Sequence, residues 1–143
     1  MCIRDRPYAC GIFGRKLETV LLRIGFTRPI IVTDYLSDSP MTEQPSSGIA
    51  EFKRNLGAYI SPRDITQLFS RAIEAPNIEN EHGIPFVIAY GCSDNTRRFW
   101  SLETGRKYLD YQPKDDTEII YANEIRDLLT GDGTDIRGGK VGI

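Results

Sequence analysis

The sequence predicts an α/β fold in which parallel strands carry packed helices. Two short apolar runs, Thr19–Ile24 and Phe86–Tyr90, are each followed by a glycine, which is typical of buried parallel strands. An amphipathic helix signal with clear start and stop residues lies between them. We expect the two strands to share one sheet and the helix to pack on it.

Before the first strand, the stretch from Pro7 to Lys16 is predicted to be the end of a helix. Its last residues are basic and suit the negative C-terminal pole of a helix. After the strand, residues 37–48 form a polar run punctuated by proline and glycine. Loops of this length are either functional lids or disordered segments, and both interpretations stay open.

The clearest helix begins at Ser61. Ser61 is predicted to be the N-cap, with Pro62 at the first helical position and Asp64 closing a pair that resembles a capping box. Pro76 ends the helix. The apolar residues predicted to pack on the sheet recur at spacings of three and four: Ile65, Leu68, Phe69, Ala72 and Ile73.

Two more helices are predicted toward the C-terminus. Ser101 should cap a short helix that runs to about Leu109, and Pro113 prevents its continuation. Residues 118–129 should form a last helix, and residues 131–143 are Gly-rich and predicted to be a flexible tail. The apolar residues of the last helix are Ile119, Ile120, Ile125 and Leu128.

Composition excludes several classes of protein. A chain of 143 residues, with 40% hydrophobic and 27% charged residues, is sized for one globular domain. Its net charge of −2 gives no reason to expect nucleic acid or a membrane surface as a partner, and no apolar run could span a bilayer. Three scattered cysteines and one histidine indicate neither a disulfide framework nor a metal site. We therefore expect a cytoplasmic protein.

Several polar groups invite a catalytic interpretation. The Gly-rich residues 131–140 do not fit a phosphate loop, because the spacing is wrong and Val141 stands where a Ser or Thr is needed. The carboxylates of Asp115, Asp116 and Glu118 are interpreted as a solvated face with helix N-terminal charges. For Arg97 and Arg98 two interpretations stand: binding of an anionic substrate, or pairing with a carboxylate of the protein itself.

The segment after the second strand carries a family resemblance. It reads Gly91-Cys92-Ser93-Asp94-Asn95-Thr96-Arg97-Arg98-Phe99-Trp100 and continues later to Leu109-Asp110-Tyr111-Gln112-Pro113. This order resembles the C-terminal signature of the extended short-chain dehydrogenase/reductase superfamily. The similarity is to the NAD-dependent epimerase/dehydratase group and its uronate dehydrogenase-like branch, although Asp110 stands where the family usually has glycine. The resemblance implies the C-terminal part of a Rossmann-type fold, an incomplete domain.

The resemblance also assigns roles near the first strand. In the family, the loop after this strand passes the nicotinamide and the substrate, and Gly25, Phe26 and Thr27 take that position. Gly25 and Phe26 are therefore predicted to contact the cofactor, NAD or NADP, and Thr27 the substrate. Phe26 stands where uronate dehydrogenases commonly have a small polar residue.

Arg54 is the second predicted substrate ligand. The run from Arg54 to Ser61 is similar to one in uronate dehydrogenases whose arginine grips the sugar carboxylate. A guanidinium suits that task, since it offers two parallel donors and stays charged. The alternative is a surface arginine without a function.

Two family motifs do not occur in the 143 residues: the Gly-x-x-Gly-x-x-Gly turn that cradles the dinucleotide, and the Tyr-x-x-x-Lys pair. Hence no catalytic residue is assigned, and the chain by itself is expected to be inactive. Residues 1–6 resemble a translated sequencing-adapter scar, so residues 7–130 are predicted to be the C-terminal portion of a longer domain.

The resemblance implies an NAD(P)-dependent oxidoreductase or epimerase that acts on a sugar or uronic acid by hydride transfer. Its implied partner is a small-molecule sugar, and a homodimer is compatible with the full-length form. The competing hypothesis is a non-catalytic sugar-binding or interaction member of the same superfamily.

Overall fold

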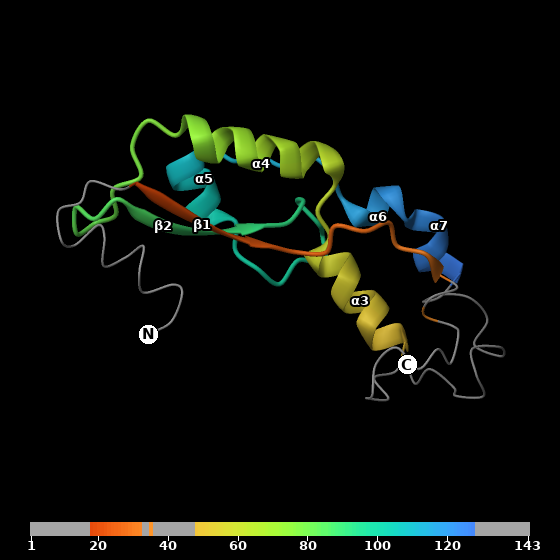
Figure 1. Ribbon diagram of the computed structural model, residues 1–143. Helices are drawn as coiled ribbons and strands as arrows, with labels where there is room; N and C mark the ends of the chain where they lie inside the picture. Colours follow the sequence, from red (N-terminus) through yellow and green to blue (C-terminus); the bar gives the residue numbers. More distant parts are fainter. Residues whose placement is uncertain (1–17, 33–34, 36–47, 128–143) are drawn as a thin grey trace.

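The structure, a computed structural model, describes residues 18–32, 35 and 48–127 (Figure 1). Its elements, in chain order, are β1 (Thr19–Ile24), α3 (Gly48–Ala58), α4 (Pro62–Glu74), β2 (Phe86–Gly91), α5 (Glu103–Leu109), α6 (Thr117–Ile120) and α7 (Ala122–Ile125). None of the helices within these ranges could cross a membrane, because all are too short or too polar. The predicted elements at residues 7–16, 37–47 and 131–143 lie outside the described residues.

The centre of the fold is a parallel sheet of β1 and β2. This confirms the α/β class, both predicted strands and their place in one sheet. Helices α4 and α5 cover one face of this sheet (Figure 1). Val87 and Ala89 of β2 belong to the larger core cluster, together with Leu68 of α4 and Leu109 of α5. Ile88, which lies between Val87 and Ala89 in the strand and on the opposite face of the sheet, is 37% exposed.

Of the two hydrogen bonds predicted for the capping box at the start of α4, the structure contains one. The Asp64 N–H donates to Ser61 Oγ at 3.1 Å, as an N-cap requires. The reciprocal bond of the capping box is absent, because the Ser61 N–H donates to Ser93 Oγ at 3.0 Å instead. The Asp64 carboxylate accepts from that same Ser93 hydroxyl at 2.6 Å. Ser93 therefore bridges the two halves of the predicted box.

The apolar stripe of α4 is narrower than predicted. Leu68 is fully buried, and Ile65 and Ala72 pack against the same core. Phe69 and Ile73 are 49% and 83% exposed, so the prediction that they pack on the sheet is wrong. The sheet of the described residues has only two strands, so it is wide enough to cover one row of α4 side chains, and Phe69 and Ile73 lie outside that row.

A second core lies beyond the carboxyl ends of the strands and is built around α3, for which the sequence analysis assigns no element. Its buried members are Ile30, Phe52, Leu56, Tyr59, Tyr121 and Ile125. Phe52 and Leu56 lie on one side of α3 and are completely buried. This packing explains why a polar stretch forms a helix, since burial of an apolar face outweighs weak local propensity.

The C-terminal part follows the predictions less closely. The predicted N-cap Ser101 is wrong by one residue, because the N-cap of α5 is Leu102. The Ser101 hydroxyl still accepts from the Glu103 N–H at 3.2 Å. The helix ends at Leu109, as predicted. The single helix predicted for 118–129 is instead the pair α6 and α7, which meet at Tyr121. Ile119 and Ile120 are 80% and 44% exposed, whereas Tyr121 and Ile125 are buried in the second core. Leu128 lies outside the described residues.

Candidate functional site

The carboxyl ends of both strands meet the end of α3, and the crossing is close. Gly25 N–H donates to Gly91 O, Phe26 N–H to Ala58 O, and Ile60 N–H to Phe26 O, each at 2.9 Å. A Cβ on Gly25 would lie 1.9 Å from Ala58 O. Glycine at this position is therefore required for α3 to approach the sheet.

The residues predicted to bind the cofactor take part in these backbone hydrogen bonds. The N–H groups of Gly25 and Phe26 are both bonded within the protein, and the Phe26 ring packs against the second core. Thr27, which follows, is exposed. The structure thus gives Gly25 and Phe26 structural tasks, and leaves Thr27 accessible; their roles toward a cofactor or substrate stay predictions.

Arg54 lies on α3 and is exposed. It is two residues from each of the buried Phe52 and Leu56, which places it on the opposite side of the helix. Its side chain makes no ion pair or hydrogen bond with any residue in the described ranges, and Arg28 is the only other arginine there of which this is true. The arginines with partners are Arg23, Arg63, Arg71, Arg97, Arg98, Arg106 and Arg126.

The Ser93 side chain of the signature segment serves the fold. Ser93 is fully buried and joins the end of β2 to the start of α4 through its bonds with Ser61 and Asp64. The Asp64 carboxylate also accepts the N–H groups of Lys114 and Asp115, at 2.9 and 3.1 Å. One buried carboxylate therefore joins three segments that are distant in sequence.

Asn95 does the same for the end of α3. Its Nδ2 donates to Gly57 O at 3.3 Å and to Tyr59 O at 2.8 Å, and its Oδ1 accepts from Thr117 N–H at 3.2 Å. The Thr117 hydroxyl donates to Leu56 O at 3.1 Å. The last carbonyls of a helix have no partners within it, so these side chains supply them. Asn95 of the signature and Thr117 thereby fix the end of the helix that carries Arg54.

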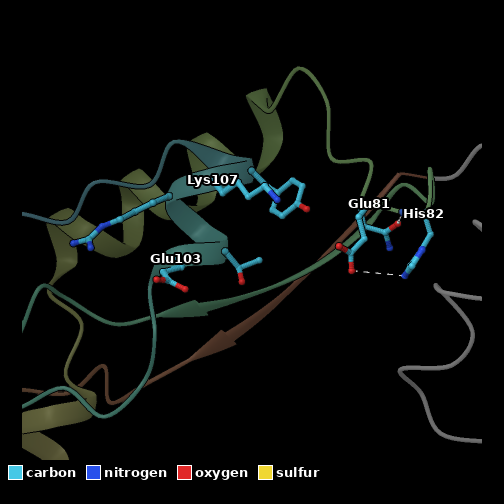
Figure 2. A pocket seen from close by; sticks show the side chains of 8 residues that line it. Glu81, His82, Glu103 and Lys107 are labelled. Atoms are coloured by element: carbon cyan, nitrogen blue, oxygen red, sulfur yellow. Dashed lines mark hydrogen bonds and ion pairs between the residues drawn. The ribbon is translucent and has the colours of Figure 1, made fainter.

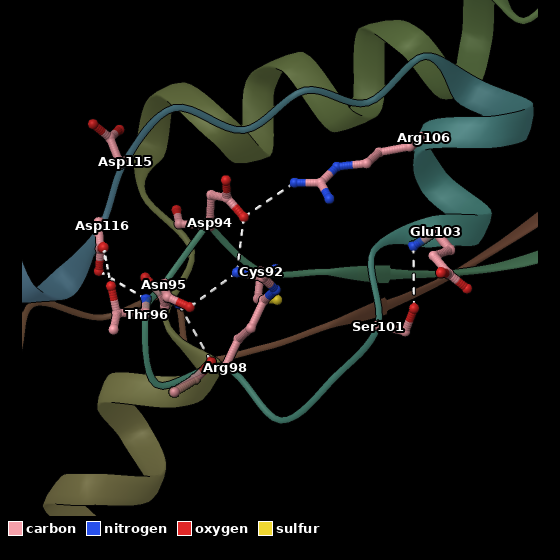
Figure 3. Close-up of polar contacts among 12 residues, drawn as sticks. Cys92, Asp94, Asn95, Thr96, Arg98, Ser101, Glu103, Arg106, Asp115 and Asp116 are labelled. Atoms are coloured by element: carbon pink, nitrogen blue, oxygen red, sulfur yellow. Dashed lines mark hydrogen bonds and ion pairs between the residues drawn. The ribbon is translucent and has the colours of Figure 1, made fainter.

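The arginines of the signature segment pair with carboxylates, as one of the two interpretations stated. Arg97 pairs with Glu118, and Arg98 with Asp94 at 2.9 Å. Arg106 of α5 approaches the same Asp94 oxygen at 3.1 Å, so Asp94 lies between two guanidinium groups (Figure 3). Neither Arg97 nor Arg98 is free to bind an anion without losing its partner.

Asp116 accepts hydrogen bonds from the N–H and the hydroxyl of Thr96 and from the N–H of Glu118 (Figure 3). Burial acts to raise the pKa of Asp116, but these bonds and the charge of Arg98 outweigh it, so the pKa lies below its usual value. Asp116 is thus an N-cap of α6, which agrees with its interpretation as a helix N-terminal charge.

Cys92 offers no nucleophile. It is fully buried, and burial raises the pKa of its thiol to about 11. The neighbouring Tyr111 hydroxyl donates to Cys92 O at 2.9 Å, and burial raises the pKa of this tyrosine as well. Both groups stay neutral at physiological pH.

A surface pocket of about 740 Å³ lies elsewhere (Figure 2). It is lined by the turn before β2 and by α5: Asn80, Glu81, His82, Glu103, Thr104, Arg106, Lys107 and Tyr108. Ligands of open α/β sheets sit at the carboxyl ends of the strands, whereas this pocket adjoins the amino end of β2. The part of the chain that the structure describes holds no group of three His, Cys, Asp or Glu side chains placed to bind a metal ion.

Comparisons with known proteins agree with the signature. No family model matches the chain. The chain is 29% identical over 106 residues to a uronate dehydrogenase of Pseudomonas syringae, covering 74% of this chain and 29% of that protein. It is 34% identical over 75 residues to an NAD-dependent glucose-6-phosphate dehydrogenase of Haloferax volcanii, covering 52% of this chain and 26% of that protein.

The fold is also similar to a solved structure. The crystal structure of a glucuronic acid dehydrogenase from Chromohalobacter salexigens superposes with a TM-score of 0.54 at 22% identity, over 85% of this chain and 36% of that one. The chain therefore spans about a third or less of the length of the proteins it matches. These matches confirm the resemblance to the uronate dehydrogenase-like branch, and they agree with the α/β fold.

Proposed function

We propose that this chain forms the sugar-recognising part of an NAD(P)-dependent dehydrogenase that acts on a sugar or a uronic acid. The observation that carries the proposal is Arg54, an exposed arginine without a described partner, one helical turn before the crossing of α3 with the strand ends. The three matched proteins are all sugar or uronate dehydrogenases, which supports the proposal.

The proposed role of Arg54 follows from its chemistry. A guanidinium presents two parallel N–H donors to both oxygens of a carboxylate, and it stays charged at any working pH. Asn95 and Thr117 hold the last turn of α3 through hydrogen bonds to its carbonyl groups, and this fixes the helix position of Arg54. Thr27 is exposed, and its hydroxyl would bind a sugar hydroxyl at the same end of the sheet.

The cofactor of the proposed reaction, NAD or NADP, would accept the hydride. The N–H groups of Gly25 and Phe26 cannot donate to its pyrophosphate, because they are already bonded within the protein. The dinucleotide turn and the Tyr-x-x-x-Lys pair do not occur in the 143 residues. We therefore assign no step of hydride transfer to this chain.

A chimera tests the proposal. Residues 19–127 would replace the matched segment of the Pseudomonas syringae uronate dehydrogenase, and glucuronate oxidation would be followed by NADH absorbance. Arg54→Lys should then lower kcat/KM for glucuronate about tenfold or more, because one charge-assisted bond is lost. Arg71→Lys is the matched control, since Arg71 lies on α4 and pairs with Asp110. Equal rates for the parent and Arg54→Lys, within about twofold, would contradict the assignment of Arg54.

A non-catalytic sugar-binding protein is the second candidate. It is favoured by the combination of an unpaired Arg54 with the lack of both redox motifs in this sequence. The chimera distinguishes the two candidates. A folded chimera that binds glucuronate without oxidising it would favour the binding protein, and turnover would favour the dehydrogenase.

A further inference from the structure

Phe99 is an exposed aromatic residue that is nevertheless held in place. It lies on the loop after β2 and is 55% exposed. Its ring meets the Trp100 ring edge to face, with the centroids 5.2 Å apart, and Trp100 stacks on Tyr90 at the same centroid distance. The Arg23 guanidinium lies 5.0 Å from the centre of the Tyr90 ring. A row of packed rings thus fixes one edge of Phe99 while much of its surface stays accessible.

Phe99 also touches α3, on the side that bears Arg54. A Cβ on Gly57 would lie 3.0 Å from Cδ1 of Phe99 and 2.6 Å from Arg97 O, so the loop is packed directly on the helix there. Arg54 precedes Gly57 by three residues, and positions i and i+3 of a helix are neighbours, about 5–6 Å apart at Cβ. An arginine side chain is longer than that separation. Arg54 and the Phe99 ring therefore lie on the same side of α3.

We propose that Phe99 and Arg54 together recognise an acidic pyranose, an inference that rests on the proposed function. The carbon-bound hydrogens on one face of the sugar ring would pack on the Phe99 ring, and the carboxylate would bind the Arg54 guanidinium. Aromatic rings attract such a face through burial of apolar surface and through their negative ring face. Phe99 would thereby select ring-shaped acids over open-chain acids, and this adds a residue that determines specificity.

Binding to the 143-residue chain tests this, with three probes measured by ligand-observed NMR titration. Glucuronate has the ring and the charge, glucose has the ring alone, and glycolate has the charge alone. Phe99→Ala should weaken glucuronate binding about threefold to tenfold and leave glycolate unchanged. Arg54→Lys should weaken glucuronate and glycolate and leave glucose unchanged. Phe69→Ala is the matched control, because Phe69 is 49% exposed but lies on α4.

The outcomes separate this inference from the proposed function. If Arg54→Lys weakens glucuronate binding and Phe99→Ala changes it by less than about twofold, the role of Phe99 is refuted and the proposed function stands. An equal loss in Phe69→Ala refutes the role of Phe99 as well. If the parent chain binds no glucuronate, both fail. Circular dichroism melting checks the fold of each variant. Should Phe99→Ala unfold, Phe99→Leu keeps the packing on Gly57 without the aromatic face and takes its place under the same criteria.

Discussion

At the scale of single residues, Asp110 occupies a backbone conformation that favours glycine. It ends α5 with φ 50° and ψ 37°, in the left-handed region. It is the one non-glycine residue of the described ranges with a positive φ. The resembling family usually has glycine there, and glycine adopts this conformation without a steric cost. Aspartate tolerates it better than most residues.

Replacement of Asp110 tests that cost. Asp110→Gly should raise the free energy of unfolding by about 0.5 kcal/mol, because the relief of strain exceeds the exposed ion pair with Arg71. Asp110→Ala should lower it by about 1 kcal/mol, since alanine keeps the strain and loses the contacts. Urea denaturation measures both. If Asp110→Ala is as stable as Asp110→Gly or more stable, backbone strain at residue 110 is refuted.

Asp116 gives a pH dependence with a definite sign. Its pKa is lowered in the folded protein, so its contribution to stability is present above the unfolded value, near pH 4, and is lost as the pH falls through the folded pKa. Asp116→Asn should cost about 1 kcal/mol at pH 7 and flatten the loss of stability below about pH 4. Asp127→Asn, at an exposed residue, is the control. Urea denaturation between about pH 2 and 7 measures the effect; parallel curves for parent and Asp116→Asn would refute it.

At the scale of elements, α4 approaches the sheet most closely at one contact. A Cβ on Gly91 of β2 would lie 2.6 Å from Cδ2 of the buried Leu68. The row of α4 that faces the sheet is fixed by this contact, together with the buried Asp64 one turn earlier. Phe69 and Ile73 are equally apolar but lie outside this row.

A double-mutant cycle tests the contact. Leu68→Ala should cost about 2–5 kcal/mol and Gly91→Ala about 1–3 kcal/mol, the first by leaving a cavity and the second by overpacking. The double mutant should be less destabilised than the sum by about 1 kcal/mol, because the new methyl group fills part of the cavity. Ile73 is 83% exposed, so the destabilisation by Ile73→Ala and that by Gly91→Ala should simply add in the double mutant. Additivity in the Leu68 pair would show that the two residues do not touch.

At the scale of the whole molecule, the sheet is covered unevenly. Within the described residues α4 and α5 lie on one side of it (Figure 1), and Ile88 on the other face is partly exposed. Parallel sheets are usually covered on both faces. The proteins that match this chain are about three times as long as the matched part, and two thirds of their length has no counterpart here.

The whole chain is therefore expected to bind NAD poorly and to show no turnover. The physical reason is the lack of the dinucleotide turn and the Tyr-x-x-x-Lys pair, which carry most cofactor contacts in the resembling family. Isothermal titration calorimetry with NAD measures this, and the Haloferax volcanii NAD-dependent relative is a positive control. Micromolar affinity of the 143-residue chain would show that its cofactor site lies elsewhere.

The sequence by itself determined the features that depend on neighbouring residues. Apolar runs ending in glycine defined both strands, and Ser61 and Pro62 defined the start of α4, because an N-cap and a first helical residue act on the adjacent backbone. The signature from Gly91 to Trp100 identified the branch that the comparisons support.

Only the tertiary structure decided which side chains would find partners. Asp64 bonds with Ser93 and Lys114, which are 29 and 50 residues away in the chain. Periodicity could not reveal that Leu68 faces the sheet while Phe69 does not, since both fit one apolar stripe. It also could not reveal that Asn95 holds α3, or that Phe99 lies beside the helix of Arg54. Such contacts depend on how distant segments pack, which no local pattern encodes.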